Sequence, residues 1–178
     1  MGEDIDEDLE MWEEASGPAV KRLDNRVLLR PISDLRYPKN PASVAPGEPA
    51  GKALETMASK NLGALLVVEG GKVVGIFSER DALKKGLYQG GRGDRPVREF
   101  MTANPDCLTP LDPIALAMNR MGVGGYRHVP LVDSGHRPVG LLVMRDVVRY
   151  ILAFFPTEAL NCPPHSEVDP PERNPEGG

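Results

Sequence analysis

Apolar residues recur along this chain with the two spacings that distinguish helices from strands. Around residues 50–57 they are spaced i, i+3, i+4 and i+7, which predicts a helix with one buried face. These residues are Ala50, Ala53, Leu54 and Met57. Residues 64–77, ALLVVEGGKVVGIF, predict two strands joined at Gly70 and Gly71, because glycine readily adopts the positive φ angles of a tight hairpin turn.

A short extended stretch precedes this helix, and a second helix follows the hairpin. The extended stretch runs through Val44 and ends at Pro46, because the residue before a proline is disfavoured in helical conformation. The second helix begins near Ser78. The predicted order of elements is therefore β–α–β–β–α.

The whole pattern occurs a second time, 64 or 65 residues further along. RPISDL at 30–35 corresponds to RPVREF at 95–100, and GIFSERD at 75–81 corresponds to GLLVMRD at 140–146. The apolar helix face recurs at Ile114, Ala117, Met118 and Met121, and the hairpin recurs as HVPLVDSGHRPVGLLV. Landmarks repeated in the same order predict two copies of one unit.

Each copy of roughly 55 residues is small for an independent hydrophobic core, so we expect the copies to pack together with pseudo-twofold symmetry. Such packing creates two related clefts, where ligands commonly bind. The predicted fold class is α/β, in the α+β sense, with two β–α–β–β–α repeats. The predicted organisation is an acidic N-terminal segment at 1–26, repeats at 27–86 and 95–160, a linker at 87–94 and a disordered Pro-rich tail at 161–178.

Charge is distributed unevenly along the 178 residues, whose net charge is −5. The first 14 residues hold eight acidic and no basic side chains, whereas residues 24–160 hold 18 basic and 14 acidic ones. A mildly basic body suits a small anion and is too weakly basic to predict nucleic-acid binding. No apolar run approaches the roughly 18 residues of a membrane span, and the N-terminus lacks a signal-peptide pattern, so we expect a cytoplasmic protein.

The stretch GIFSERD gives its aspartate two possible roles. Ser78 and Asp81 have the spacing of a capping box, which satisfies free N–H groups at the start of a helix. In the second copy Val143 stands at the serine position, yet Asp146 persists. An acid in the first helical turn also gains from the helix dipole. The loss of one capping partner nevertheless favours ligand contact for at least one of the two aspartates.

These ordered landmarks resemble a tandem pair of CBS domains, often called a Bateman module. The resemblance rests on the x-P-x-x-P entry into the first helix, the strands LLVVE and VPLVD, and the motif G-h-x-[S/T]-x-x-D, which stands here as GIFSERD. It covers residues 30–152. Proteins of this family commonly bind AMP, ADP or ATP between the copies, and less often S-adenosylmethionine or NADH. The resemblance implies an adenine nucleotide as ligand and no required cofactor.

The resemblance also implies roles for particular residues. The motif aspartates, Asp81 and Asp146, would take the ribose hydroxyls, since a carboxylate accepts two hydrogen bonds at once. The groups implied for phosphate, which Arg binds with charge-assisted bonds, are Ser78, Arg80, Arg145, Arg127 and His128. The residues implied for the base pockets are Val44, Ala45, Leu108, Thr109, Ala64, Leu65, Val129 and Pro130.

The two copies differ at these implied sites. Val143 removes the hydroxyl that Ser78 supplies in the first copy. Gly63 and Ala64 stand where the second copy has Arg127 and His128, and Ala45 stands where it has Thr109. We therefore expect the two clefts to be unequal.

Two functions fit these observations. One is a non-catalytic regulatory sensor, in which a nucleotide occupies the cleft and its occupancy alters contact with an unidentified protein partner. The other is a structural or docking homodimer that engages a partner through its acidic N-terminal segment without nucleotide binding. The resemblance implies a homodimer, because similar modules usually pair into a flat disc of four repeats. The last helix closes on a strongly apolar run at 147–155, VVRYILAFF, which suggests packing on the first copy or across a dimer.

Catalysis and metal binding find little support in the sequence. The chain has three histidines and no recognisable pairing of a nucleophile with a base, so we expect no enzyme activity. Cys162 and His165 offer two metal ligands without a second pair. Two distant cysteines, Cys107 and Cys162, form no disulfide framework.

Overall fold

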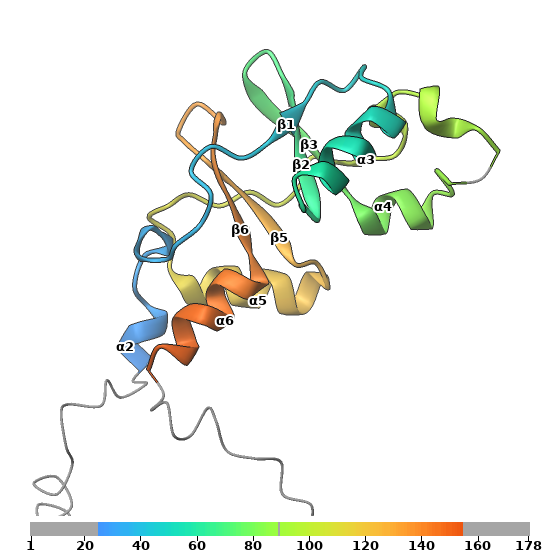
Figure 1. Cartoon of the computed structure of the whole chain (residues 1–178). Helices are drawn as coiled ribbons and strands as arrows, with labels where there is room; N and C mark the ends of the chain where they lie inside the picture. Colours follow the sequence, from blue (N-terminus) through green and yellow to red (C-terminus); the bar gives the residue numbers. More distant parts are fainter. Residues whose placement is uncertain (1–24, 89, 155–178) are drawn as a thin grey trace, which may run out of the picture. The chain divides into compact units, whose positions relative to one another are not determined.

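The computed structural model describes residues 25–88 and 90–154 (Figure 1). Most of the acidic N-terminal segment, the Pro-rich tail, and Cys162 with His165 lie outside these residues, and so do the predictions made for them. Both repeats belong to one unit of the fold. Helix α2 (Asn25–Leu28) comes first in the described part of the chain, and the linker contains the 3-10 turn η2 (Arg92–Asp94).

The first repeat has the predicted order of elements. These are strand β1 (Ser43–Val44), helix α3 (Ala50–Ser59), strands β2 (Ala64–Glu69) and β3 (Lys72–Ser78), and helix α4 (Glu79–Lys84). Strand β1 pairs with β2 in parallel, and β2 pairs with β3 antiparallel. The turn between β2 and β3 has φ angles of 56° at Gly70 and 77° at Gly71, which confirms the predicted role of the two glycines.

The second repeat lacks the regular first strand. It contains helix α5 (Ile114–Gly124), the antiparallel strands β5 (His128–Val132) and β6 (Pro138–Val143), and helix α6 (Met144–Leu152). The strand expected through Leu108 is reduced to one parallel bridge with Leu131. Pro130 explains the difference. Leu66, its counterpart in the first repeat, donates its backbone N–H to the Ala42 carbonyl, whereas proline has no N–H to donate.

The segment that opens each repeat packs on the other repeat. The 3-10 turn η1 (Ile32–Asp34) bonds to the backbone just ahead of α5, and the turn η3 (Val97–Glu99) bonds to the backbone just ahead of α3. The equivalent bonds run from Ile32 N–H to the Asp112 carbonyl at 2.9 Å and from Val97 N–H to the Glu48 carbonyl at 2.8 Å. The two copies therefore exchange their leading segments symmetrically.

The exchange also adds a strand to the first repeat. Strand β4 (Thr102–Ala103) follows η3 and pairs antiparallel with β3, where Ile76 faces Thr102. The sheet of the first repeat consequently has the order β1-β2-β3-β4, and that of the second repeat has only β5 and β6. A segment that opens the second repeat in sequence thereby comes to lie beside the motif of the first.

Three groups of buried apolar residues form the core. The first surrounds Phe77 in the first repeat and includes Val97 and Phe100 from the exchanged segment. The second lies in the second repeat and includes Ile32 and Leu35. The third joins the two hairpins and consists of Leu66, Val73, Val132 and Leu141. Burial of apolar surface between the hairpins therefore holds the repeats together.

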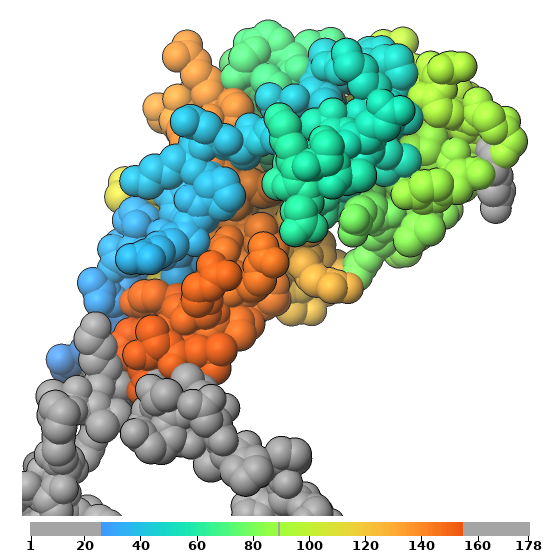
Figure 2. All heavy atoms as spheres, viewed as in Figure 1, coloured from blue at the N-terminus to red at the C-terminus, as the bar shows by residue number. Residues whose placement is uncertain are grey.

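The surface view agrees with this exchange. Figure 2 shows residues 25–40, in blue, beside α6, in orange, over the second repeat. Tyr37 and Leu28 from the leading segment pack with Tyr150 and Ile151 of α6 against the same core. No helix among the described residues is long and apolar enough to cross a membrane.

Candidate functional site

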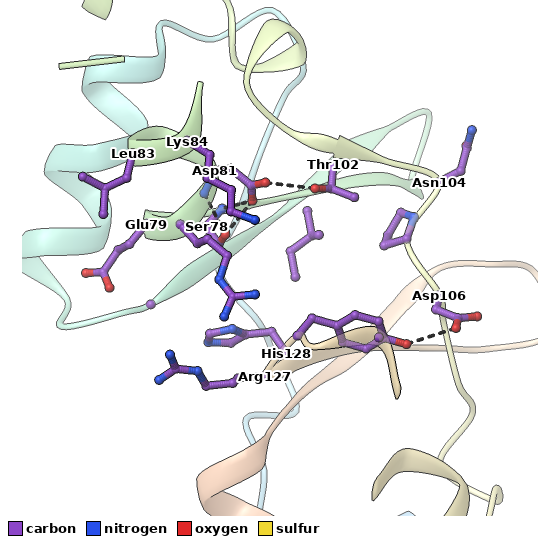
Figure 3. A pocket seen from close by; sticks show the side chains of 16 residues that line it. Ser78, Glu79, Asp81, Leu83, Lys84, Thr102, Asn104, Asp106, Arg127 and His128 are labelled. Carbon is purple, nitrogen blue, oxygen red and sulfur yellow. Dashed lines mark hydrogen bonds between the residues drawn. The ribbon is translucent and has the colours of Figure 1, made fainter. Parts of the chain in front are cut away.

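A cleft of about 660 Å³ opens beside the motif of the first repeat (Figure 3). Its walls come from the end of β3 with α4, from the exchanged segment around β4, and from the connection between α5 and β5. Five of the residues named from the sequence line it: Ser78, Arg80, Asp81, Arg127 and His128. The fold thus brings a motif from the first repeat to face basic side chains from the second.

Asp81 takes part in the capping box that its spacing predicts. Ser78 N–H donates to Asp81 Oδ2 at 3.0 Å, and Asp81 N–H donates to Ser78 Oγ at 3.3 Å. The Ser78 hydroxyl also donates to Asp81 Oδ2, at 2.5 Å. These bonds begin α4 and hold the carboxylate in the wall of the cleft. Because serine has one hydroxyl proton, that proton is committed to Asp81 in this structure.

The other carboxylate oxygen of Asp81 bonds to the exchanged segment. Thr102 Oγ1 donates to Asp81 Oδ1 at 2.9 Å. Figure 3 shows Thr102 reaching the carboxylate from the neighbouring strand. Each carboxylate oxygen can accept about two hydrogen bonds, so Oδ1 retains one acceptor position. Asp81 is therefore both a helix cap and an oriented acceptor in the cleft.

The facing wall carries an arginine and a histidine from the second repeat. Arg127 and His128 lie where β5 begins, across the cleft from Ser78 and Asp81 (Figure 3). Gly63 leaves room for the imidazole, since a Cβ at position 63 would lie 3.1 Å from His128 Nε2. Burial lowers the pKa of His128 below 6.5, and the neighbouring Arg127 lowers it further. The imidazole is therefore neutral at pH 7.

Arg80 connects the two repeats across the cleft. Its Nη1 donates to the Gly125 carbonyl at 2.5 Å, although 45 residues separate the two. Gly125 is the C-cap of α5, with a φ of 64°, where helical carbonyls lack partners within the helix. The Arg80 guanidinium on α4 thereby supplies a hydrogen-bond donor to a backbone carbonyl at the C-terminal end of α5.

Opposite charges are intermixed in the lining. The fixed cations are Arg80, Lys84 and Arg127, and the carboxylates are Glu79, Asp81 and Asp106. An anion would therefore be recognised by local placement of cations rather than by net charge. Within residues 25–88 and 90–154, no group of three or more His, Cys, Asp or Glu side chains is arranged to hold a metal ion. The chemistry that these groups offer is hydrogen bonding and charge pairing.

Tyr126 and Asp106 form a hydrogen-bonded pair in the lining. Tyr126 Oη donates to Asp106 Oδ2 at 3.0 Å, and Arg120 Nη1 lies 3.3 Å from the same oxygen. Burial raises the pKa of Tyr126, and the bond to Asp106 raises it further, so the phenol stays protonated at neutral pH. The aromatic ring is thus anchored through its hydroxyl.

The second motif aspartate lies outside this cleft. Asp146 is 8% exposed and accepts the Val143 N–H at 3.2 Å, which is the counterpart of the Ser78–Asp81 backbone bond. Arg149 Nη1 lies 3.7 Å from its other oxygen. Arg145 is exposed and does not line the cleft either. Asp146 therefore has capping contacts and a helical ion pair, whereas Asp81 also faces the cleft.

None of the eight residues named for the base pockets lines the 660 Å³ cleft. Six are buried: Val44, Leu108, Ala64, Leu65, Val129 and Pro130. Ala45 and Thr109 begin turns, in which their N–H groups donate to Glu48 and Asp112 respectively. The lining instead includes residues that the sequence reasoning missed: Thr102, Asn104, Asp106, Lys84 and Tyr126.

Comparison with known proteins places both repeats in one family. The model of the CBS domain matches residues 32–88 and 97–153. An uncharacterized 17.7 kDa protein of Acidianus ambivalens is 32% identical over 110 residues, which are 61% of this chain and 66% of that protein. Matches to several longer curated proteins span between 11% and 39% of their length.

Solved structures share the fold. A CBS-domain-containing protein from Agrobacterium tumefaciens has a TM-score of 0.64 at 29% identity, covering 73% of this chain and 99% of that one. The CBS domain pair of the protein MJ0100, in complex with 5′-methylthioadenosine and S-adenosyl-L-methionine, has a TM-score of 0.61 at 26% identity. That match covers 69% of this chain and 96% of the other.

Proposed function

This chain belongs to the CBS domain family, and we propose that its cleft binds an adenosine-containing ligand as part of a regulatory, non-catalytic role. The observation that carries the proposal is the position of Asp81. Its carboxylate is fixed by Ser78 and Thr102 in the wall of the cleft, facing Arg127 and His128. A site of this kind presents an acceptor for hydroxyls opposite donors for an anion.

Asp81 would hold the ribose. A ribose hydroxyl is an O–H donor, and Asp81 Oδ1 has one acceptor position left beside its bond from Thr102. The Thr102 bond orients the carboxylate before the ligand arrives, which reduces the cost of ordering it. Ser78 would act by positioning Asp81, because its hydroxyl proton is already donated to that carboxylate.

Arg127, Arg80 and His128 would hold phosphate. Arg127 and Arg80 offer charge-assisted bonds, and the neutral His128 offers one N–H donor. The preferred ligands are therefore AMP, ADP and ATP, ahead of ligands without phosphate at that position. The bound 5′-methylthioadenosine and S-adenosyl-L-methionine of the MJ0100 domain pair support the adenosine class in a relative, and NADH is a further member of it.

Regulation would act through the link between Arg80 and Gly125. A phosphate that takes the Arg80 guanidinium competes with the Gly125 carbonyl, so occupancy would loosen the connection between α4 and α5. We propose that the chain forms a homodimer and that a protein partner binds it differently when the connection between α4 and α5 is loosened. Light scattering with and without AMP measures the molar mass in solution and so tests the dimer. The mass of a monomer in both conditions would refute the proposed homodimer. The docking hypothesis rests on a segment mostly outside the described residues.

Thermal unfolding tests the ligand class. AMP, ADP, ATP, NADH and S-adenosylmethionine would each be added at millimolar concentration, with ribose and inorganic phosphate as controls. A ligand present at about 100 times its Kd adds about 2.7 kcal/mol of stability. For a chain of this size that corresponds to a rise in Tm of roughly 5–11 °C. If no adenosine compound raises Tm above the controls, the proposed function is wrong.

A further inference from the structure

His128 places a titratable ring at the boundary between the two repeats. The residue begins β5 in the second repeat, and its imidazole lies against Gly63, the residue just ahead of β2 in the first. A Cβ at position 63 would lie 3.1 Å from Nε2 and 3.2 Å from Cε1. The side chain is half-buried and lines the cleft across from Ser78 and Asp81 (Figure 3). Its charge therefore acts directly on a ligand in the cleft.

The charged groups around this imidazole oppose one another. Burial, the largest effect, lowers the pKa of His128 below 6.5. Arg127 and Arg145 lower it further, because a nearby cation disfavours a second positive charge. Glu79 on α4 and Asp146 on α6 act in the opposite direction. Among the described residues no hydrogen bond holds either ring nitrogen, so added negative charge can change the protonation of the ring.

A bound phosphate would supply that negative charge. A phosphate monoester carries about 1.5 to 2 negative charges at pH 7, and an opposite charge within about 4–6 Å favours the protonated form of a histidine. The same phosphate would pair with Arg127, which is the cation that most strongly opposes a proton on His128. Protonation also gives the imidazole a second N–H donor. The three effects favour the same bound state, in which the ring is charged.

We propose that a phosphate bound in the cleft draws a proton onto His128, so that the ligand affinity of this chain rises as the pH falls from 7.5 toward 6. This inference rests on the proposed function and adds regulation of the same site by pH. Its sign follows from linkage, because a ligand that promotes protonation is itself bound more tightly by the protonated chain, by the same factor. Adenosine has no phosphate, so its binding should take up no proton at His128.

Titration calorimetry in two buffers of different ionisation enthalpy counts the protons taken up on binding. AMP and adenosine are titrated at pH 6.5 into the native chain, His128→Gln and His136→Asn. His136 is the matched control, because it is exposed in the turn between β5 and β6 and asparagine tolerates its φ of 62°. With AMP, the native chain and His136→Asn are expected to take up roughly a few tenths of a proton more than His128→Gln. The AMP phosphate itself titrates near pH 6 in all three titrations, so the difference between the chains reports His128.

A second measurement needs no substitution at position 128. The chain has three histidines, and the Cε1 protons of His136 and His165 are identified in NMR spectra by their absence from His136→Asn and His165→Asn. The remaining signal belongs to His128, and its titration midpoint is expected to rise by about one pH unit or more with AMP and to stay in place with adenosine. A midpoint that ignores AMP, or equal proton uptake by the native chain and His128→Gln, would overturn the inference while the proposed function stands. If the native chain binds neither AMP nor adenosine, the proposed function fails and the inference fails with it.

Discussion

Thr102 Oγ1 donates a hydrogen bond of 2.9 Å to Asp81 Oδ1, and this bond joins two parts of the chain that the repeat pattern assigns to different copies. Asp81 belongs to the motif of the first repeat, and Thr102 belongs to the segment that opens the second. The exchange of leading segments brings them together. One wall of the cleft therefore exists only because β4 pairs with β3.

Replacing Thr102 with valine is expected to weaken AMP binding by about threefold to tenfold. The change keeps the branched side chain and removes one bond to Asp81, and hydrogen bonds to charged groups are typically worth about 1.5–3 kcal/mol. Water that reaches the Asp81 carboxylate replaces part of the free energy lost with this hydrogen bond. Thr56→Val is the matched control, since Thr56 bonds within α3 to the Lys52 carbonyl. The affinity for AMP is measured by calorimetry. If Thr102→Val and Thr56→Val bind AMP equally well, Thr102 does not orient Asp81.

Arg127 and Arg145 lie in different environments and should behave differently. Arg127→Ala is expected to weaken AMP binding about tenfold or more and to affect adenosine little, because adenosine lacks the phosphate. Arg145→Ala is expected to change neither affinity, since Arg145 does not line the cleft. Kd values for both ligands and both variants are measured at one ionic strength, because salt screens such contacts. A loss of AMP affinity in Arg145→Ala alone would contradict the position of the phosphate.

His128 should make the protein less stable in mild acid. Its pKa is lowered below 6.5 in the folded state, mainly by burial, so the unfolded state binds more protons as the pH falls below about 6.5. The stability that the neutral imidazole contributes is present above pH 6.5 and is lost as the pH falls through the lowered pKa. In urea unfolding between pH 5 and 8, the free energy of unfolding should fall more steeply with decreasing pH for the native chain than for His128→Gln. Parallel curves would mean that His128 titrates normally.

Two glycines at equivalent positions should differ in their tolerance of alanine. A Cβ at Gly140 would lie 2.6 Å from a ring carbon of Tyr37, whereas a Cβ at Gly75 would lie 2.5 Å from the sulfur of Met101. The flexible methionine can move aside more easily than the tyrosine ring. Overpacking typically lowers the free energy of unfolding by roughly 1–3 kcal/mol, and the loss should be larger for Gly140→Ala than for Gly75→Ala. Denaturant unfolding measures both. Since each neighbour comes from an exchanged segment, two harmless substitutions would argue against the exchange itself.

Local features of the fold could be predicted because they depend on residues close in sequence. The hairpin turn at Gly70-Gly71, the apolar face of the first helix and the cap at Ser78 each lie within a few residues of their partners. The regular strand expected at Leu108 is absent because a single proline, Pro130, removes the donor on the partner strand. Equivalent patterns in two copies thus do not guarantee equivalent pairing.

The site was only partly predictable because half of it depends on long-range packing. The motif spacing identified Asp81, and the repeat alignment marked Arg127 and His128 as a difference between the copies. Thr102 and Asp106 gave no such signal, because the sequence places them at the start of the second repeat and the fold places them beside the first. The same alignment gave no indication that Asp146 would be nearly buried.

Calorimetric titration of AMP, ADP and ATP into the native chain, Asp81→Ala and Ser78→Ala tests whether the Asp81 carboxylate holds the ligand. Both variants remove the capping box and should lose about 1 kcal/mol of stability, but only one loses the carboxylate. We expect saturable binding to the native chain, retained within about tenfold in Ser78→Ala and abolished in Asp81→Ala. Unchanged affinity in a folded Asp81→Ala would contradict this expectation and leave Asp81 as a helix cap alone.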